Sequence, residues 1–386
     1  MREVMAVGQE FAFVGHGSAV EAWRFLARGR AGAATWQETP RWPSSPRPLP
    51  GPDACVSNQR GFKAFAAECD LSAFGIESAP VDLLVSCSSC RSGGKGATFH
   101  VLGGPVPAGS FARLNNRLLL SSPELTVIQF CGAQGRLMPL MPAFVESTHS
   151  EQAVGAMFGV DRRDIAIDHP LRWESKRRLI QAAVLTCEFA GTYRLAVGEG
   201  TVAYGVDPIM SLASLREAAD ALTPSQATRR ATSVCGLAFD GSASPRETSL
   251  ALMLTLPIDF GGFGIKKPQL NARIDASEHD GVLADREVVT PDFLWADEQV
   301  ALEYDSAEFH AERGATQVGR DAARSNILAA LGYRVFRATP QVTGSLAAVS
   351  LLARQVSAAL GVPLEPIDGI QQLRREKLYL MLFAGR

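Results

Sequence analysis

Acidic side chains stand between residues 290 and 305 where a β-sheet normally places apolar ones, and this pattern constrains the fold most. Residues 300–305 read VALEYD and alternate as a half-buried strand does, since successive side chains of a strand point to opposite faces. Glu303 and Asp305 therefore share one face, roughly 7 Å apart. The segment predicts a strand that carries two carboxylates on one side.

A hairpin is predicted to bring a third carboxylate to the same place. If residues 296–299 form a four-residue loop, Trp295 pairs with Val300, and Asp292 then lies opposite Glu303. Like charges that face each other across a ladder destabilise a sheet, and a partly buried carboxylate is costly unless it is compensated. A divalent cation with oxygen ligands supplies that compensation. A solvent-facing acidic edge is the alternative.

The bulk composition indicates a globular protein of two domains. The chain has 386 residues, of which 46% are hydrophobic and 20% charged. A formal charge of −2 and a pI near 6.3 give no overall attraction to nucleic acid or to an anionic membrane. Any such contact must therefore come from local basic clusters. The alternative interpretation of these clusters is that they are solvated helix faces. The clusters are residues 172–178 (RWESKRR), which include Arg177 and Arg178, Arg229 with Arg230, and residues 374–377.

The cysteines favour a reducing compartment. There are seven of them, an odd number, all between residues 55 and 235, which is not the pattern of a disulfide framework. Cys87 and Cys90 form a single CxxC, with His100 the nearest other possible ligand, and read either as a metal or redox pair or as ordinary thiols in a loop. No secretory signal is recognised, and the apolar stretches are too short to span a bilayer. We expect a soluble cytoplasmic protein without a membrane partner.

The N-terminal part, residues 1–238, reads as a mixed α/β domain. A helix over 18–28 is predicted to begin with Ser18 as N-cap and Glu21 completing a capping box. Residues 81–86 and 98–102 are expected to form a hairpin whose tip is the glycine run 93–96. Further helices are predicted to start at Ser122 and to cover about 173–189, 211–222 and 224–238.

The C-terminal part is predicted to start after a composition break at residues 240–242. Its elements read in order as helix, three strands, helix, strand and helix across residues 242–362, followed by a charged helical tail over 363–386. Ser244 is expected to cap the first helix, which ends before Pro257. The later elements are a strand over 270–274, the acidic hairpin, a helix over 315–331, a strand over 333–337 and a helix over 346–360.

This order, with Pro-Asp on one strand and Glu-x-Asp on the next, resembles the PD-(D/E)xK nuclease superfamily. The likeness is greatest to very-short-patch-repair endonucleases and related bacterial endonuclease-like domains, and it covers roughly residues 242–345. It implies an α/β (α+β) protein with a restriction-endonuclease-like αβββαβ core. The matching residues are Pro291, Asp292, Glu303, Tyr304, Asp305, His310, Arg320, Asp321 and the run from Gly332 through Arg334 to Arg337.

The resemblance implies roles for the acidic residues and for one histidine. Asp292 would be the central ligand of Mg²⁺ or Mn²⁺ and Glu303 a second ligand, while His310 would assist the attacking water or the leaving group. Glu247 matches an acidic residue that the first helix often contributes and would be a further metal ligand, although a capping box with Ser244 also accounts for it. Asp305 would join Asp292 and Glu303 in the catalytic group. It stands where the family usually has lysine, a departure that weighs against efficient hydrolysis.

Basic residues complete the expected site, since Arg320 and Arg337, with Arg177 and Arg178, would contact DNA. The N-terminal part resembles AbiEi-type antitoxin or regulator proteins through Phe99-His100-Val101, residues 113–120 and the Ser122-Pro123-Glu124 helix start. Two functions follow. One is a metal-dependent DNA endonuclease, in defence, toxin–antitoxin or repair. The other is a non-catalytic antitoxin-like regulator, or a module that binds DNA or an unidentified protein through a degenerate nuclease fold.

Overall fold

The computed structural model shows a mixed α/β protein. It describes residues 10–28, 48–49, 51, 54–132, 170–196, 201–275, 288–305 and 326–383. The chain divides into two compact units, and the division near residue 238 lies beside the predicted boundary. Unit 1 comprises Met1–Leu140 with Arg178–Ala238, and unit 2 comprises Met141–Arg177 with Phe239–Arg386.

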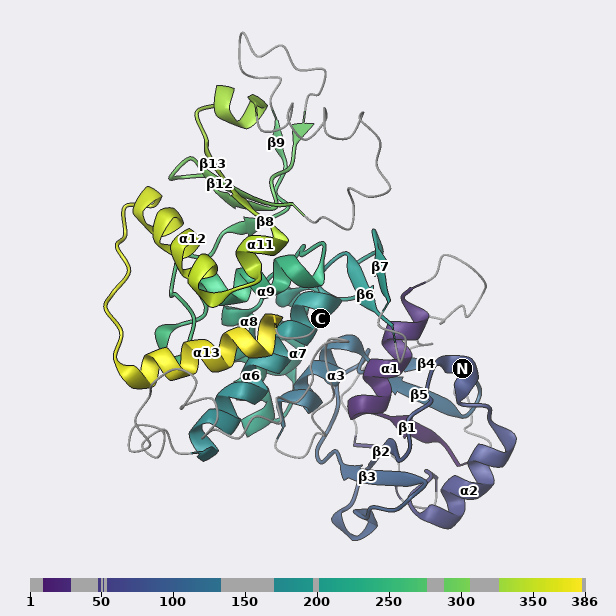
Figure 1. Ribbon diagram of the computed structural model, residues 1–386. Helices are drawn as coiled ribbons and strands as arrows, with labels where there is room; N and C mark the ends of the chain where they lie inside the picture. Colours follow the sequence, from purple (N-terminus) through teal and green to yellow (C-terminus); the bar gives the residue numbers. More distant parts are fainter. Residues whose placement is uncertain are drawn as a thin grey trace. The chain divides into compact units, whose positions relative to one another are not determined.

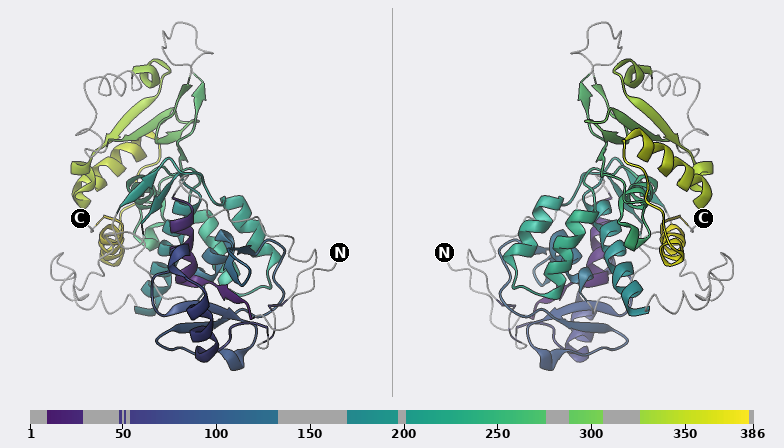
Figure 2. Two further views of the ribbon diagram at one scale, coloured as in Figure 1. Left: turned by 90° about the vertical axis from the view of Figure 1, so that its right-hand side faces the viewer. Right: turned by 90° about the vertical axis from the view of Figure 1, so that its left-hand side faces the viewer.

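Unit 1 is built on a five-stranded sheet in the order β3-β2-β1-β5-β4. Pairing is parallel between β1 and β5 and between β2 and β3, and antiparallel between β1 and β2 and between β4 and β5. Figure 1 and Figure 2 show the strands together, in purple and blue. They are β1 (Ala12–Val14), β2 (Val81–Val85), β3 (Ala97–Val101), β4 (Phe111–Arg113) and β5 (Leu118–Ser121).

Helices and a small ribbon complete unit 1. Helix α3 begins at the predicted N-cap Ser122 and packs against α1, α7 and α8. The predicted helices over 211–222 and 224–238 are confirmed as α7 and α8, each opened by a serine capping box. The elements are α1 (His16–Leu26), α2 (Gln59–Glu68), α3 (Pro123–Cys131), α6 (Pro170–Phe189), which crosses the unit division, β6 (Tyr193–Leu195), β7 (Val202–Tyr204), α7 (Leu212–Ala221) and α8 (Gln226–Leu237).

The predicted hairpin over 81–102 is wrong, because β2 and β3 run parallel. The glycine run instead returns onto the start of β3, where Gly93 forms an isolated antiparallel bridge with Thr98. The connection therefore returns from the end of β2 to the side where β2 starts, so that β3 runs in the same direction as β2. Two apolar runs with a glycine-rich turn between them do not distinguish these arrangements from sequence.

The predicted cap of the first helix is also wrong. Helix α1 begins two residues earlier, after Gly15, without a side-chain cap, and Ser18 lies buried inside it. The Ser18 hydroxyl accepts the N–H of Asp82 at 2.9 Å, and the Glu21 carboxylate accepts the hydroxyl of Ser78. Both side chains make tertiary hydrogen bonds across many residues, which no local capping rule anticipates.

Unit 2 contains a four-stranded sheet in the order β13-β12-β11-β8 and a two-stranded ribbon of β9 and β10. The strands β8, β11 and β12 pair antiparallel, and β13 joins parallel to β12. Residues 326–330, before β13, are helical, as predicted for the end of the helix over 315–331. The strands are β8 (Gln269–Leu270), β9 (Ile274–Asp275), β10 (Val288–Val289), β11 (Phe293–Trp295), β12 (Val300–Tyr304) and β13 (Arg334–Ala338).

The helices of unit 2 follow the sequence pattern closely. Helix α9 (Pro245–Thr255) starts at the predicted cap Ser244, whose hydroxyl accepts the Glu247 N–H. Helix α12 (Leu346–Ala359) covers the predicted range and follows the short α11 (Pro340–Thr343). The described part of the chain holds no helix long and apolar enough to cross a membrane.

The charged C-terminal helix α13 (Gly369–Phe383) packs against α9 within unit 2. The Ser249 hydroxyl of α9 donates to the carbonyl of Leu382 at 2.9 Å. Arg375 is buried, donates to the Gly262 carbonyl at 3.0 Å and lies 4.1 Å from the Phe263 ring centroid. Of the basic cluster over 374–377, Arg375 is therefore a packing residue rather than part of an open basic face.

Candidate functional site

The hairpin register places the predicted acidic pair on neighbouring strands. Trp295 pairs with Val300 as predicted, and Phe293 pairs with Leu302. Asp292 is the residue directly before β11, so the same register brings it opposite Glu303. Glu303 is buried and Asp292 is half-buried.

Asp292 is held by backbone groups on both sides. Its Oδ2 accepts the N–H of Tyr304 at 2.6 Å, so the carboxylate turns toward β12. Its carbonyl oxygen accepts the N–H of Asn271 at 3.0 Å. A charge-assisted hydrogen bond from a backbone donor stabilises an ionised carboxylate, and this offsets part of its repulsion by Glu303.

The Glu247 carboxylate contacts both the residues that precede α9 and Asn271, which directly follows β8. Its Oε2 accepts the N–H of Ala243 at 3.0 Å and the side-chain amide of Asn271 at 2.9 Å. The Ser244 half of the predicted capping box is present, since its hydroxyl accepts the Glu247 N–H, while the Glu247 carboxylate accepts the N–H of Ala243, the residue before the cap. Asn271 connects this carboxylate to Asp292, because its side chain donates to Glu247 and its backbone N–H donates to the Asp292 carbonyl.

Asn271 links the two acids, and the sequence analysis did not single it out. Its side-chain amide donates both to Glu247 and to the Gly241 carbonyl, and its backbone N–H donates to Asp292. Its φ of +50° lies in the left-handed region, which asparagine tolerates better than most residues. An asparagine at the end of a short strand is the only sequence signal for this connection.

Arg337 lies beside Glu303 in the parallel ladder. The register between β12 and β13 pairs Glu303 with Arg337, and paired residues of neighbouring strands point to the same face. Arg337 is exposed while Glu303 is buried. A cation at the surface thus stands next to the most buried carboxylate of the site.

The acidic face is also the face that packs on the helix at residues 326–330. Ala301, two residues before Glu303, belongs to an apolar cluster with Ile327, Leu328 and Leu331. Asp305 is half-buried just beyond β12, and its N–H donates to the Ala338 carbonyl at 2.7 Å. The carboxylates therefore lie where the apolar cover of this face ends.

The remaining predicted site residues are His310, Arg320, Arg177 and Arg178. His310 and Arg320 lie outside the described residues. Arg177 and Arg178 are half-buried neighbours on α6, at the division between the two units. Within the described ranges, no three His, Cys, Asp or Glu side chains are grouped as a complete metal site.

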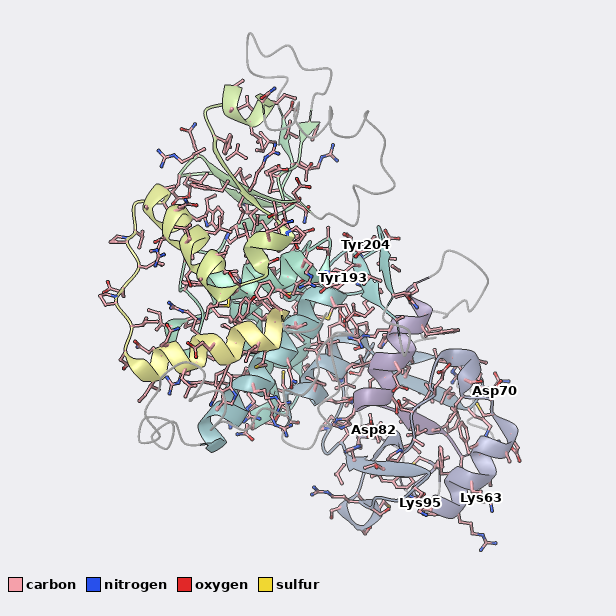
Figure 3. All side chains as sticks on the ribbon, in the orientation of Figure 1. Lys63, Asp70, Asp82, Lys95, Tyr193 and Tyr204 are labelled. Carbon is pink, nitrogen blue, oxygen red and sulfur yellow. The ribbon has the colours of Figure 1, made fainter. Side chains whose placement is uncertain are left out.

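Unit 1 holds a buried polar cluster that the sequence analysis did not predict. His16 follows β1 with a φ of +49°, and its N–H donates to Gln129 Oε1 at 2.8 Å. The rings of His16 and His100 lie 4.0 Å apart, and His100 Nε2 is 2.7 Å from Asp82 Oδ1. Asp82 is labelled in Figure 3. Burial first, and His100 second, lowers the pKa of His16 from 6.5 to about 3.

This low pKa predicts acid sensitivity of unit 1. His16 stays neutral in the folded state, whereas the unfolded chain binds a proton below its pKa of 6.5, so the free energy of unfolding falls between pH 6.5 and about 3. At about pH 5 this single group should cost about 2 kcal/mol relative to neutral pH. His16→Asn tolerates the backbone but does not titrate, and its denaturation curves should show a correspondingly shallower loss between pH 7 and about 5. Equal pH slopes in both proteins would refute this assignment.

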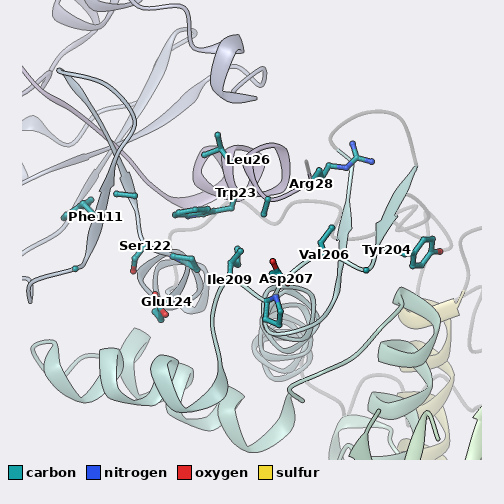
Figure 4. Close-up of a pocket in the computed structure, with 16 residues that line it drawn as sticks. Trp23, Leu26, Arg28, Phe111, Ser122, Glu124, Tyr204, Val206, Asp207 and Ile209 are labelled. Carbon is teal, nitrogen blue, oxygen red and sulfur yellow. The ribbon is translucent and has the colours of Figure 1, made fainter. Parts of the chain in front are cut away.

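Unit 1 also has an open groove with a cavity volume of about 900 Å³ (Figure 4). It is lined by the end of α1, the start of α3 and the 204–209 loop, with Trp23 among its apolar residues. Two of its charged groups, Arg28 and Glu124, have internal partners. Arg28 donates to the Thr201 hydroxyl at 2.9 Å, and Glu124 accepts the Ser214 hydroxyl at 2.8 Å. These residues are scattered along the sequence and form no motif.

The acidic hairpin is thus the arrangement that sequence and structure indicate together. It combines Asp292 and Glu303 on adjacent strands, Glu247 joined through Asn271, and Arg337 in register. Comparison with known proteins finds no matching family model, no matching curated protein and no matching solved structure.

Proposed function

We propose that unit 2 is a divalent-metal-dependent endonuclease domain that hydrolyses phosphodiester bonds of DNA. The observation that carries the proposal is the register that sets Asp292 opposite Glu303 on the face that also carries Arg337. Apart from the β9–β10 ribbon, which lies between β8 and β11 in the chain, the order α9, β8, β11, β12, helical residues 326–330 and β13 follows the αβββαβ pattern, and β13 is parallel to β12, which supports the proposal.

Asp292 and Glu303 would hold Mg²⁺ or Mn²⁺. Their donors are hard carboxylate oxygens, which suit these cations, and two protein ligands leave coordination positions for water and a phosphate. A bound cation would polarise the phosphate and lower the pKa of a water molecule. Glu247 accepts hydrogen bonds from Ala243 and Asn271. Its proposed role is to hold Asn271 in place, whose backbone N–H donates to the Asp292 carbonyl.

Arg337 is proposed to supply the positive charge that the usual lysine would provide. Asp305 occupies the lysine's place in the sequence, and Arg337 reaches the same face from the next strand. A fixed guanidinium beside the phosphate stabilises the extra negative charge of the transition state. Arg320 and the pair Arg177 and Arg178 remain proposed DNA contacts.

Cleavage of supercoiled plasmid with Mg²⁺ or Mn²⁺, and its loss with a chelator, is the direct test. Arg337→Ala should lower the cleavage rate by about 10²-fold, the scale for losing one charge-stabilising donor. Arg334→Ala is the matched control, because Arg334 is also exposed on β13 but three residues away, on the opposite face of the strand. Equal rates for the two variants would remove Arg337 from the mechanism.

The second candidate is a non-catalytic, antitoxin-like regulator that binds DNA or a protein partner. The replacement of the lysine by Asp305 favours it, as does the engagement of Glu247 in helix capping. A protein that binds DNA without cleaving it at any Mg²⁺ or Mn²⁺ concentration would support this function. The DNA affinity should then fall with salt according to the number of phosphate contacts.

A further inference from the structure

Two cysteines of unit 1 meet in the connection that leaves β2. Cys87 lies two residues past the end of this strand, and Ser88–Cys90 form a single 3-10 turn that brings Cys90 back beside it. The Sγ atoms are 3.0 Å apart, about 1 Å more than a disulfide bond. The two sulfur atoms therefore already lie close to bonding distance.

The pair is accessible to small reagents. Cys87 and Cys90 are both half-buried, and the two serines between them are exposed. Arg91 and Lys95 are exposed in the same connection, and Lys95 is labelled in Figure 3. These basic residues favour the approach of an anionic reagent.

The two thiols are not equivalent. Cys87 Sγ lies 3.1 Å from the Ser89 hydroxyl as well as close to Cys90 Sγ. The Cys90 thiol, followed by the Ser89 hydroxyl, lowers the pKa of Cys87, whereas the interaction with Cys87 raises the pKa of Cys90. An accessible thiol of lowered pKa next to a second thiol is the arrangement of reactive CxxC pairs.

The other cysteines lack this combination. Cys55, Cys131, Cys187 and Cys235 are buried, and burial raises the pKa of Cys55 to about 11 and of Cys131 to about 12. Cys69 is half-buried, and its Sγ accepts a hydrogen bond from the Asn115 amide. In the described part of the chain, Cys87 and Cys90 belong to no group of three metal-ligating side chains, so zinc binding has less support than thiol chemistry.

We propose that Cys87 and Cys90 form a redox site that exchanges reversibly with a small anionic disulfide such as glutathione disulfide, Cys87 attacking and Cys90 resolving. This site is independent of the nuclease proposal.

The reaction proceeds in two balanced steps. The Cys87 thiolate attacks one sulfur of the small disulfide, a mixed disulfide forms and one thiolate leaves. Cys90 then loses its proton to solvent and attacks Cys87 Sγ, which forms the Cys87–Cys90 bond and releases the second thiolate. The protein dithiol is oxidised by two electrons, and one small disulfide is reduced to two thiols.

The test equilibrates the full chain with glutathione redox buffers, alkylates the remaining thiols and identifies them by mass spectrometry. Trypsin releases residues 64–91 as one peptide that contains Cys69, Cys87 and Cys90, so Cys69 is an internal control. We expect an intramolecular Cys87–Cys90 disulfide and an alkylated Cys69. In the reduced protein near neutral pH, Cys87 should be alkylated at least about tenfold faster than Cys69.

Single serine variants test the two roles, with circular dichroism to establish that each is folded. Cys90→Ser should accumulate the mixed disulfide of glutathione at Cys87, because no thiol resolves it, whereas Cys87→Ser should accumulate much less at Cys90. The proposal is overturned if folded wild-type protein forms no Cys87–Cys90 disulfide in oxidising buffer. It is equally overturned if Cys87 reacts no faster than Cys69.

Discussion

If unit 2 is the proposed nuclease, Asp292→Asn is expected to reduce its metal-dependent DNA cleavage by about 10³-fold or more, because it would remove a charged metal ligand and with it several kcal/mol of transition-state stabilisation. The fold should survive. The asparagine side chain still offers an amide oxygen to the Tyr304 N–H, which the wild-type carboxylate accepts at 2.6 Å. Initial rates of plasmid nicking at saturating Mn²⁺ measure the effect.

Asp297→Asn is the matched control. Asp297 lies in the turn of the same hairpin, is exposed, and has Lys266 as its ion-pair partner at 3.3 Å. Both substitutions remove one negative charge from the hairpin, so a general electrostatic effect would appear in both. Wild-type rates in Asp292→Asn would exclude Asp292 as a ligand, and equal losses in the two variants would point to net charge instead.

Arg24→Met is expected to destabilise unit 1 by about 3–5 kcal/mol, the cost of removing one partner of a buried ion pair. Arg24 Nε and Nη2 donate to the two carboxylate oxygens of Glu188 at 3.0 and 2.7 Å, and both residues are buried. The pair joins α1 to α6. Hydrogen exchange of the α1 amides under increasing denaturant measures the free energy of opening.

A double variant separates the charge from the packing. Arg24→Met with Glu188→Gln removes both charges of this pair, including the attraction of Glu188 for the buried Arg194 and the repulsion of Arg194 by Arg24, and the Gln oxygen can still accept the Leu195 N–H that Glu188 Oε1 accepts at 3.1 Å. The double variant should therefore recover part of the lost stability relative to Arg24→Met. If it is less stable than the single variant, the buried charge is not the main cost.

Much of unit 2 follows from local sequence. Ser244 followed by Pro245 set the start of α9, and Gly332 and Gly361 adopt the positive φ expected where helices end. The loop length between Trp295 and Val300 fixed the hairpin register, and with it the position of Asp292 against Glu303. These features depend on a few neighbouring residues, so a sequence pattern can predict them.

Unit 1 was harder to predict because its polar groups bind partners far along the chain. Ser18 and Glu21 satisfied a local capping pattern but instead bind residues near the start of β2. The His16–His100 contact joins residues that follow or form different strands. The parallel pairing of β2 with β3 depends on how the intervening chain folds back, which hydrophobic alternation does not encode.

The candidate site also contains residues that the sequence predicts and residues that it does not. The acidic pair was predicted from alternation and loop length, but Asn271 acts through its left-handed backbone and two side-chain hydrogen bonds. The pairing of Arg337 with Glu303 depends on the parallel register of β12 and β13. These strands are separated by a long stretch of sequence, so no local pattern predicts it. His310 and Arg320 lie outside the described residues, and their proposed roles remain predictions.

The proposed nuclease activity depends on metal binding by the acidic hairpin, which a thermal titration with Mn²⁺ or Mg²⁺ measures. A cation that binds only the folded state stabilises it by about 2.7 kcal/mol at 100 times its Kd. The Tm of unit 2 should rise with cation concentration in the wild type and in Asp297→Asn, and stay nearly constant in Asp292→Asn. An absence of any shift in the wild type, or an equal shift in Asp292→Asn, would contradict metal binding by the hairpin.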